Sequence, residues 1–121
     1  MNNPNLHEEI TRLHADMCAG LADPNRILLL YALAEKPHCV NDLAIEVGLS
    51  QPATSRHLKV LRESGLVRAV RQGPNVEYYL ADNRLIDALN ILRAVLRDRI
   101  TYRAELMESD ISSTNPASKM D

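Results

Sequence analysis

A short row of polar side chains has the composition and spacing needed to read the edges of DNA bases. Gln51, Ser55 and Lys59 recur every fourth residue, and Arg56 falls on the same side of a helix predicted over residues 51–64. Glutamine and arginine can make bidentate contacts with the edges of adenine and guanine, respectively. Lysine suits the phosphates, which position a protein on DNA without discriminating between sequences. The alternative is an ordinary surface helix that is polar because it faces water.

Positive charge is concentrated in and just after this helix. Between residues 50 and 75, five cations stand against one carboxylate, a net charge of +4, whereas the whole chain has a net charge of −2. Such a block indicates a local anionic partner, although a solvated helix face gives the same pattern. We predict that double-stranded DNA is contacted by Ser50, Gln51, Ser55, Arg56, His57, Lys59, Arg62, Arg68, Arg71, Gln72 and Asn75. His57 borders the apolar side of the helix, where its type and position fit a structural role as well as a base contact.

The remaining pattern predicts the elements that would position these residues. Apolar spacing and capping residues predict helices near residues 6–21, 24–36, 40–47, 51–64 and 84–106. The stretches "LVRAV" and "VEYYL" flank the turn-forming "RQGPN" and predict a β-hairpin. The third and fourth helices, joined at Gly48, form a helix-turn-helix. The predicted fold is therefore mainly α, a winged helix-turn-helix of five helices plus a two-stranded β-wing. It occupies residues 1–107, and the polar residues 108–121 are predicted to be a disordered tail.

The first and last predicted helices each carry an apolar stripe at helical spacing. These stripes are Leu6, Ile10, Leu13, Met17 and Leu21, and Leu85, Leu89, Leu92, Leu96 and Ile100. A single domain of this size cannot cover both stripes while also burying its central second helix, so we predict a homodimer formed through the first and last helices. The alternative is that both stripes pack on the core of their own chain.

Composition excludes several other classes of protein. No apolar run approaches the length needed to cross a bilayer, and the N-terminus does not resemble a signal peptide, so we expect a cytoplasmic protein without membrane contact. Two cysteines are too few for a disulfide scaffold. The sequence has no glycine-rich phosphate loop, no HExxH motif and no nucleophile with a suitably placed histidine and acid. We therefore predict that the chain is not an enzyme.

Three stretches make the sequence similar to the ArsR/SmtB family of small bacterial repressors. They are "LADPNRILLLYAL", "VNDLAIEVGLSQPATSRHLKVLRESGLV" and "RQGPNVEYYL", which occur in the family's order and with their intervals cover about residues 21–80. The resemblance implies a homodimer that binds a palindromic operator in its own promoter region. It also implies that Gln51, Ser55 and Arg56 read bases, and that an inducer, commonly a metal or metalloid ion, releases the DNA.

The sequence departs from the family at both of its usual metal sites. The family pattern "CVCDL" is here "CVNDL", so Cys39 remains but Asn41 replaces the second thiolate. The last helix has no histidine, and Asp87 and Asp98 alone would make a weak zinc site. The identity of any metal, and of the inducer, stays open.

Three interpretations of the cysteines follow. Cys39 could replace serine or threonine as a helix N-cap, with Cys18 as a small buried residue. Cys39 could instead be a reactive thiolate at the positive end of a helix, which oxidation, persulfidation or a bridge to Cys18 would switch. Lastly, His38 and Cys39 could join Cys18, His14 or His7, from the same or the other subunit, in an unusual metal site. The inducer would then be a thiol-reactive species or a metal or metalloid ion. The alternative is a winged-helix regulator or interaction module that senses neither.

Overall fold

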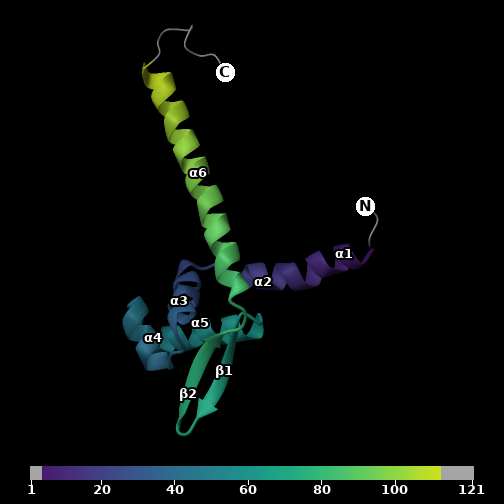
Figure 1. Cartoon of the computed structure of the whole chain (residues 1–121), viewed down its shortest axis with the longest axis vertical. Coiled ribbons are helices and arrows are strands. Elements are labelled where there is room, and N and C mark those ends of the chain that lie inside the picture. The colour runs from purple at the N-terminus through teal and green to yellow at the C-terminus, as the bar shows by residue number, and fades with distance from the viewer. Residues whose placement is uncertain (1–3, 113–121) are drawn as a thin grey trace. The chain divides into compact units, whose positions relative to one another are not determined.

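The computed structural model describes residues 4–112 and has the predicted architecture (Figure 1). Its elements are α1 (Pro4–Glu9), the π-helix η1 (Ile10–His14), α2 (Ala15–Gly20), α3 (Pro24–Glu35), α4 (Val40–Val47), α5 (Gln51–Glu63), β1 (Val67–Gln72), β2 (Asn75–Leu80) and α6 (Arg84–Ser112). The run from α1 to α2 corresponds to the predicted first helix, and α4 and α5 form the helix-turn-helix. The prediction of a winged helix-turn-helix is therefore confirmed. The chain divides between Ile86 and Asp87 into two compact units.

The helices of the first unit begin and end at residues suited to those positions. The Asp23 carboxylate caps α3 by accepting a hydrogen bond of 2.8 Å from the Asn25 N–H. The Ser50 hydroxyl caps α5 by accepting one of 3.2 Å from the Ala53 N–H. Gly48 ends α4 with a φ of +78°, a left-handed conformation that favours glycine. These residues set the tight turn that places α5 against α4.

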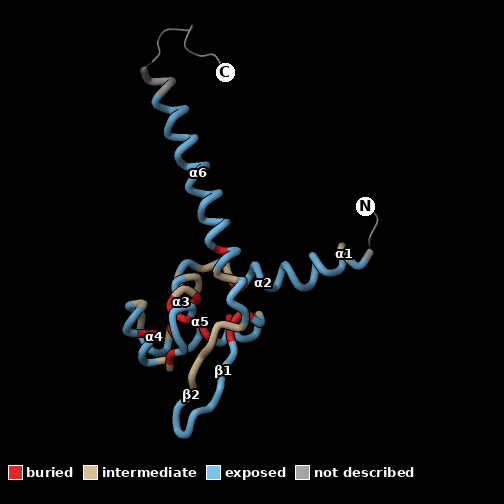
Figure 2. The backbone as a smooth tube through the Cα atoms, in the orientation of Figure 1, coloured by how far each residue is buried: buried red, intermediate tan, exposed pale blue. Residues whose placement is uncertain are grey.

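Buried residues gather around α3, α4, α5 and the start of β1 and form the core of the first unit (Figure 2). The fully buried large side chains of this core are Leu29, Leu30, Leu43, Leu58, Leu61, Leu66 and Thr54. Each buried leucine contributes about 1.5–3 kcal/mol relative to an exposed one. The Thr54 hydroxyl is satisfied because it donates to the Ser50 carbonyl over 2.9 Å. Since three of these residues belong to α5, one face of that helix is fixed to the core.

The wing is an antiparallel hairpin whose register runs from Val67 opposite Leu80 to Gln72 opposite Asn75. Gly73 has a φ of +63° and forms the turn together with Pro74. A backbone bridge between His38 and Tyr78 joins β2 to the loop between α3 and α4. Strand β2 therefore attaches the wing to the loop that precedes the helix-turn-helix.

The N-terminal helical run differs from the single continuous helix that the stripe predicts. The π-helix η1 interrupts it, and the Thr11 hydroxyl donates to the His7 carbonyl over 2.9 Å. Gly20 is buried at the end of α2, where a Cβ atom would lie 2.7 Å from the Ser64 Oγ atom. Glycine there permits a close approach between α2 and the end of α5.

The second unit consists of most of α6. This helix continues through Ser112, so residues 108–112 of the predicted tail are helical, and the rest of that tail lies outside the described residues. Along it, Ile91, Leu92, Val95, Leu96 and Ile100 are exposed. In the part of the chain that the structure describes, no helix is both long and apolar enough to cross a membrane.

Candidate nucleic-acid interface

The polar row predicted on α5 lies on the surface of the first unit. Gln51, Ser55, Arg56, Lys59 and Arg62 are all exposed. On the opposite side of the same helix, Thr54, Leu58 and Leu61 are buried. The helix thus presents an amide, a hydroxyl and three cations outward from a fixed apolar base. Such a surface can place hydrogen-bond donors against base edges and cations against phosphates.

Ser50 stands at the start of this row and has a structural task of its own. Its hydroxyl oxygen accepts the Ala53 N–H, and its backbone carbonyl accepts both the N–H and the hydroxyl of Thr54. The side chain is exposed, and the N-terminal end of a helix favours an anion. Ser50 can therefore cap α5 and still lie beside a bound phosphate.

His57 lies differently from the other residues of the predicted interface. It is half-buried, and its Nδ1 atom lies 3.3 Å from the Nη1 atom of Arg26 on α3. Because this ring nitrogen is engaged with another helix, the contact favours the structural alternative for His57. The sequence position beside the apolar side of α5 signalled this role, but not the partner.

The wing divides its predicted DNA contacts between two faces. Since alternate residues of a strand point to opposite sides, Arg68, Gln72 and Asn75 share one face, and Arg71 lies on the other. All four are exposed. The sequence spacing alone did not separate Arg71 from the rest.

A carboxylate occupies the same wing face and was missed by the sequence analysis. Glu77 lies opposite Val70 in the hairpin, on the face of Arg68 and Gln72. The Tyr79 hydroxyl donates to the Glu77 carboxylate over 3.1 Å, and this hydrogen bond raises the pKa of Tyr79 above its ordinary value. The alternation of residues 75, 77 and 79 along β2 was the signal that could have found it. This wing face therefore carries one cation, Arg68, and one carboxylate, Glu77.

The residues predicted to sense an inducer do not form a ready-made site. Cys39 is half-buried at the N-cap position of α4, but its side chain makes no capping hydrogen bond. Cys18 is an exposed free thiol in α2, so the interpretation of Cys18 as a buried residue is wrong for the single chain. Among the described residues, no three His, Cys, Asp or Glu side chains gather closely enough to hold a metal ion. The part of one subunit that the structure describes therefore does not bring together the donor set that a metal ion needs.

His38, beside Cys39, is engaged within its own chain. Its side chain is 6% exposed, and its Nε2 atom lies 3.5 Å from a Glu46 carboxylate oxygen on α4. This nitrogen is buried and has no hydrogen-bond partner among the described residues, so a metal ion could reach it only after the surrounding chain rearranges. This arrangement weakens the predicted pairing of His38 with Cys39 at one ion.

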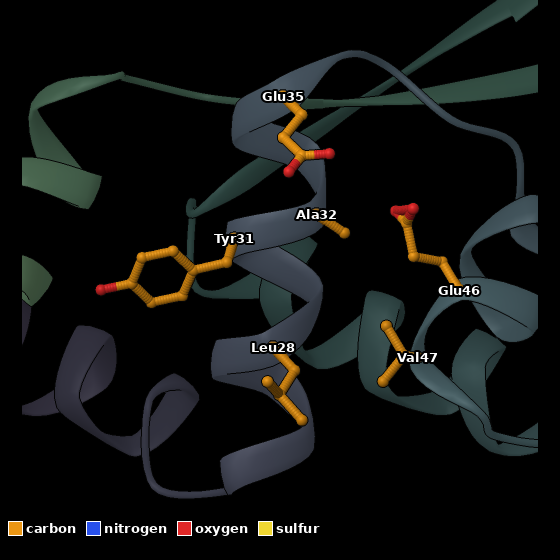
Figure 3. A pocket seen from close by; sticks show the side chains of 6 residues that line it. All are labelled: Leu28, Tyr31, Ala32, Glu35, Glu46 and Val47. Carbon is orange, nitrogen blue, oxygen red and sulfur yellow. The ribbon is translucent and has the colours of Figure 1, made fainter.

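A pocket of about 380 Å³ lies between α3 and α4 (Figure 3). Leu28, Ala32 and Val47 form its apolar part, and the carboxylates of Glu35 and Glu46 lie along one side. None of the predicted DNA contacts lines it. A ligand bound there would touch the first helix of the helix-turn-helix and not the polar row of α5.

Comparison with known proteins places these features among bacterial regulators. Residues 23–69 match the family model described as bacterial regulatory protein, arsR family. The chain is 43% identical over 81 residues to a protein of Synechocystis sp. named transcriptional repressor SmtB homolog. That match covers 67% of this chain and 59% of the relative, so the chain spans less than two thirds of that relative's length.

Two solved structures are similar in both sequence and fold. The crystal structure of NolR from Sinorhizobium fredii superposes with a TM-score of 0.67 at 33% identity, covering 78% of this chain and 94% of that one. The structure of the cadmium metal-sensor CMTR from Mycobacterium tuberculosis gives a TM-score of 0.56 at 41% identity, covering 64% and 81%. The family and the relative named as a repressor agree with the prediction that the chain is not an enzyme.

Proposed function

We propose, because this chain belongs to the ArsR family of bacterial regulatory proteins, that it is a sequence-specific DNA-binding regulator, and specifically a repressor. The observation that carries the proposal is the exposed row of Gln51, Ser55, Arg56 and Lys59 on a helix whose other face is fully buried. In a helix-turn-helix the second helix enters the major groove. Gln51 and Arg56 would then read bases, while Lys59 would contact phosphate. The proposal places the protein with the bacterial DNA, in the cytoplasm.

The proposed DNA-binding form is a homodimer on a palindromic operator. Exposed apolar side chains on both terminal helices support it, including Ile10 and Leu13 on η1 and Leu92 and Leu96 on α6. Two symmetric subunits would present two copies of α5 to half-sites about 34 Å apart, one turn of DNA. The proposed domain runs from α1 to α6 and includes the wing. Its first and last helices form the proposed dimer contact.

The proposed inducer is either a thiol-reactive species or a metal ion. The half-buried Cys39 thiol and the exposed Cys18 thiol support the first class. The cadmium-sensing relative supports the second, although the ligands would have to come from two subunits because one subunit lacks a three-ligand cluster within its described residues. Release of bound operator by zinc, cadmium, arsenite, peroxide or polysulfide, each with and without reductant, separates the two classes.

Selection from a random duplex library tests the proposed function directly. The purified full chain is expected to enrich a palindrome and to bind it at least about 10³ times more tightly than random duplex. Its affinity, measured by fluorescence anisotropy, should fall steeply with salt as phosphate contacts release counterions. A chain that enriches no sequence would instead be an interaction module.

A further inference from the structure

Arg26, near the start of α3, connects the end of α2 to α5. Its Nε atom donates to the Gly20 carbonyl over 2.8 Å, and its Nη2 atom donates to the Ala19 carbonyl over 3.2 Å. Its Nη1 atom lies 3.3 Å from the His57 Nδ1 atom. A single guanidinium therefore contacts two carbonyls at the end of one helix and a ring nitrogen on another.

The chemistry of the two side chains fixes the direction of this contact. Arginine has only donors, so the Nδ1 atom of His57 must accept, and the ring proton must lie on Nε2. The last carbonyls of a helix lack intrahelical partners and carry its negative end, where a cation is stabilising. Arg26 thus satisfies the Gly20 carbonyl, adds a second donor to the Ala19 carbonyl, which also accepts the Ala22 N–H, and selects one tautomer of His57.

A second contact joins the same two helices. The Cα atom of Gly20 packs so closely on Ser64 and Leu66 that an added Cβ atom would lie 2.7 Å from Ser64 Oγ and 3.1 Å from Leu66 Cδ1. Residues 57 and 64 are seven apart, which puts them on one side of α5 about two turns apart. The end of α2 is therefore held against α5 at two separated points, which defines an orientation as well as a position.

We propose that Arg26 and His57 are positioning residues that fix the direction of α5 relative to α2, and that His57 does not contact bases. This inference rests on the proposed function, because it gives the pair a task in DNA recognition. If α1 to α2 belongs to the dimer contact, the pair sets how the two copies of α5 are presented to successive half-sites. Sequence-specific affinity then depends on the contact, whereas the affinity for random duplex does not.

Four variants and one control test the pair on the selected palindrome. Arg26→Met and His57→Leu remove the donor and the acceptor, and each is expected to weaken binding about tenfold, with the double variant no weaker than either single one. His57→Asn keeps an acceptor near the position of Nδ1 and is expected to retain most of the wild-type affinity. Lys36→Met, which removes an exposed cation just after α3, is the control and should bind normally.

A spectroscopic measurement keeps the test independent of the stability of the variants. The ¹⁵N chemical shifts of His57 in the wild-type chain should show an unprotonated Nδ1, and Arg26→Met should shift the ring toward a mixture of tautomers. A protonated Nδ1 in the neutral wild-type ring, or undiminished operator binding by folded His57→Leu, would overturn the inference. Failure of the wild-type chain to enrich any palindrome would instead overturn the proposed function, while the tautomer measurement would still report on the contact.

Discussion

His38 and Tyr78 exchange both of their backbone hydrogen bonds, His38 donating over 3.2 Å and Tyr78 over 2.8 Å. This bridge attaches strand β2 of the wing to the loop between α3 and α4. Cys39 follows directly and takes the N-cap position of α4. Chemistry at the Cys39 thiol would therefore act next to the junction between the wing and the helix-turn-helix.

Replacement of Cys39 by serine should distinguish its role as the N-cap of α4 from a role in sensing an inducer. Cys39 has the extended backbone of an N-cap but makes no side-chain cap, so Cys39→Ser is expected to stabilise the chain by about 0.5–1 kcal/mol in urea unfolding. The variant should bind operator normally and lose release by thiol-reactive agents. If it responds to every inducer as the wild-type chain does, both sensing interpretations of Cys39 fail.

Gly20→Ala should destabilise the first unit despite the better helix propensity of alanine. The added methyl would meet Ser64 Oγ at 2.7 Å, and overpacking of this kind costs about 1–3 kcal/mol. Thermal unfolding measures the loss, with Cys18→Ala on an exposed position of the same helix as the control. Equal stability of Gly20→Ala and the wild-type chain would contradict the close packing of α2 on the end of α5.

The structure shows which features the sequence could predict and which it could not. Asp23, Gly48 and Ser50 act on the backbone within a few residues, so local pattern was enough to place the helix ends correctly. Gly20 was different, because no local sequence pattern predicts how closely its backbone packs on Ser64. Its close approach to Ser64 depends on packing between segments far apart in the chain.

The candidate site also contains some features that the local sequence predicts and others that it does not. The exposed row of α5 follows from helical periodicity, which the sequence displays directly. The partner of His57 is Arg26, 31 residues away, and no local pattern connects them. The capping bond that Cys39 fails to make also depends on side-chain geometry, which residue type does not determine.

Acid should weaken the start of α6 through Asp82. Its carboxylate accepts hydrogen bonds from the Arg84 side chain at 2.8 Å and the Arg84 N–H at 2.9 Å, which lowers its pKa from 3.8 to about 2. Because the pKa is lower in the folded chain, the stabilisation is complete above about pH 4 and is lost as the pH falls toward 2. A ¹³C titration of the Asp82 carboxyl should give a midpoint near 2 in the wild-type chain, rising toward 3.8 in Arg84→Ala. An ordinary midpoint in both chains would rule out the contact in solution.

Removal of the carboxylate from the wing should strengthen DNA binding. Glu77 shares a face with Arg68 and Gln72, so Glu77→Gln is expected to raise affinity about two- to fivefold without changing the preferred sequence. The same variant should lower the pKa of Tyr79 toward its ordinary value because the hydrogen bond to a carboxylate is lost. Glu35→Gln on α3 is the control, and a matching gain in that variant would show that only overall charge matters.

The comparison of Arg56→Ala with Lys59→Ala in repeated selections tests the central claim, that α5 reads DNA, most directly. Arg56→Ala is expected to lose about 1–3 kcal/mol on the wild-type palindrome and to relax its preference at one base pair of each half-site. Lys59→Ala should select the wild-type sequence, bind all duplexes more weakly, and reduce the slope of affinity against salt by about 1. Recovery of the wild-type palindrome at unchanged affinity and salt dependence by both variants would contradict the account.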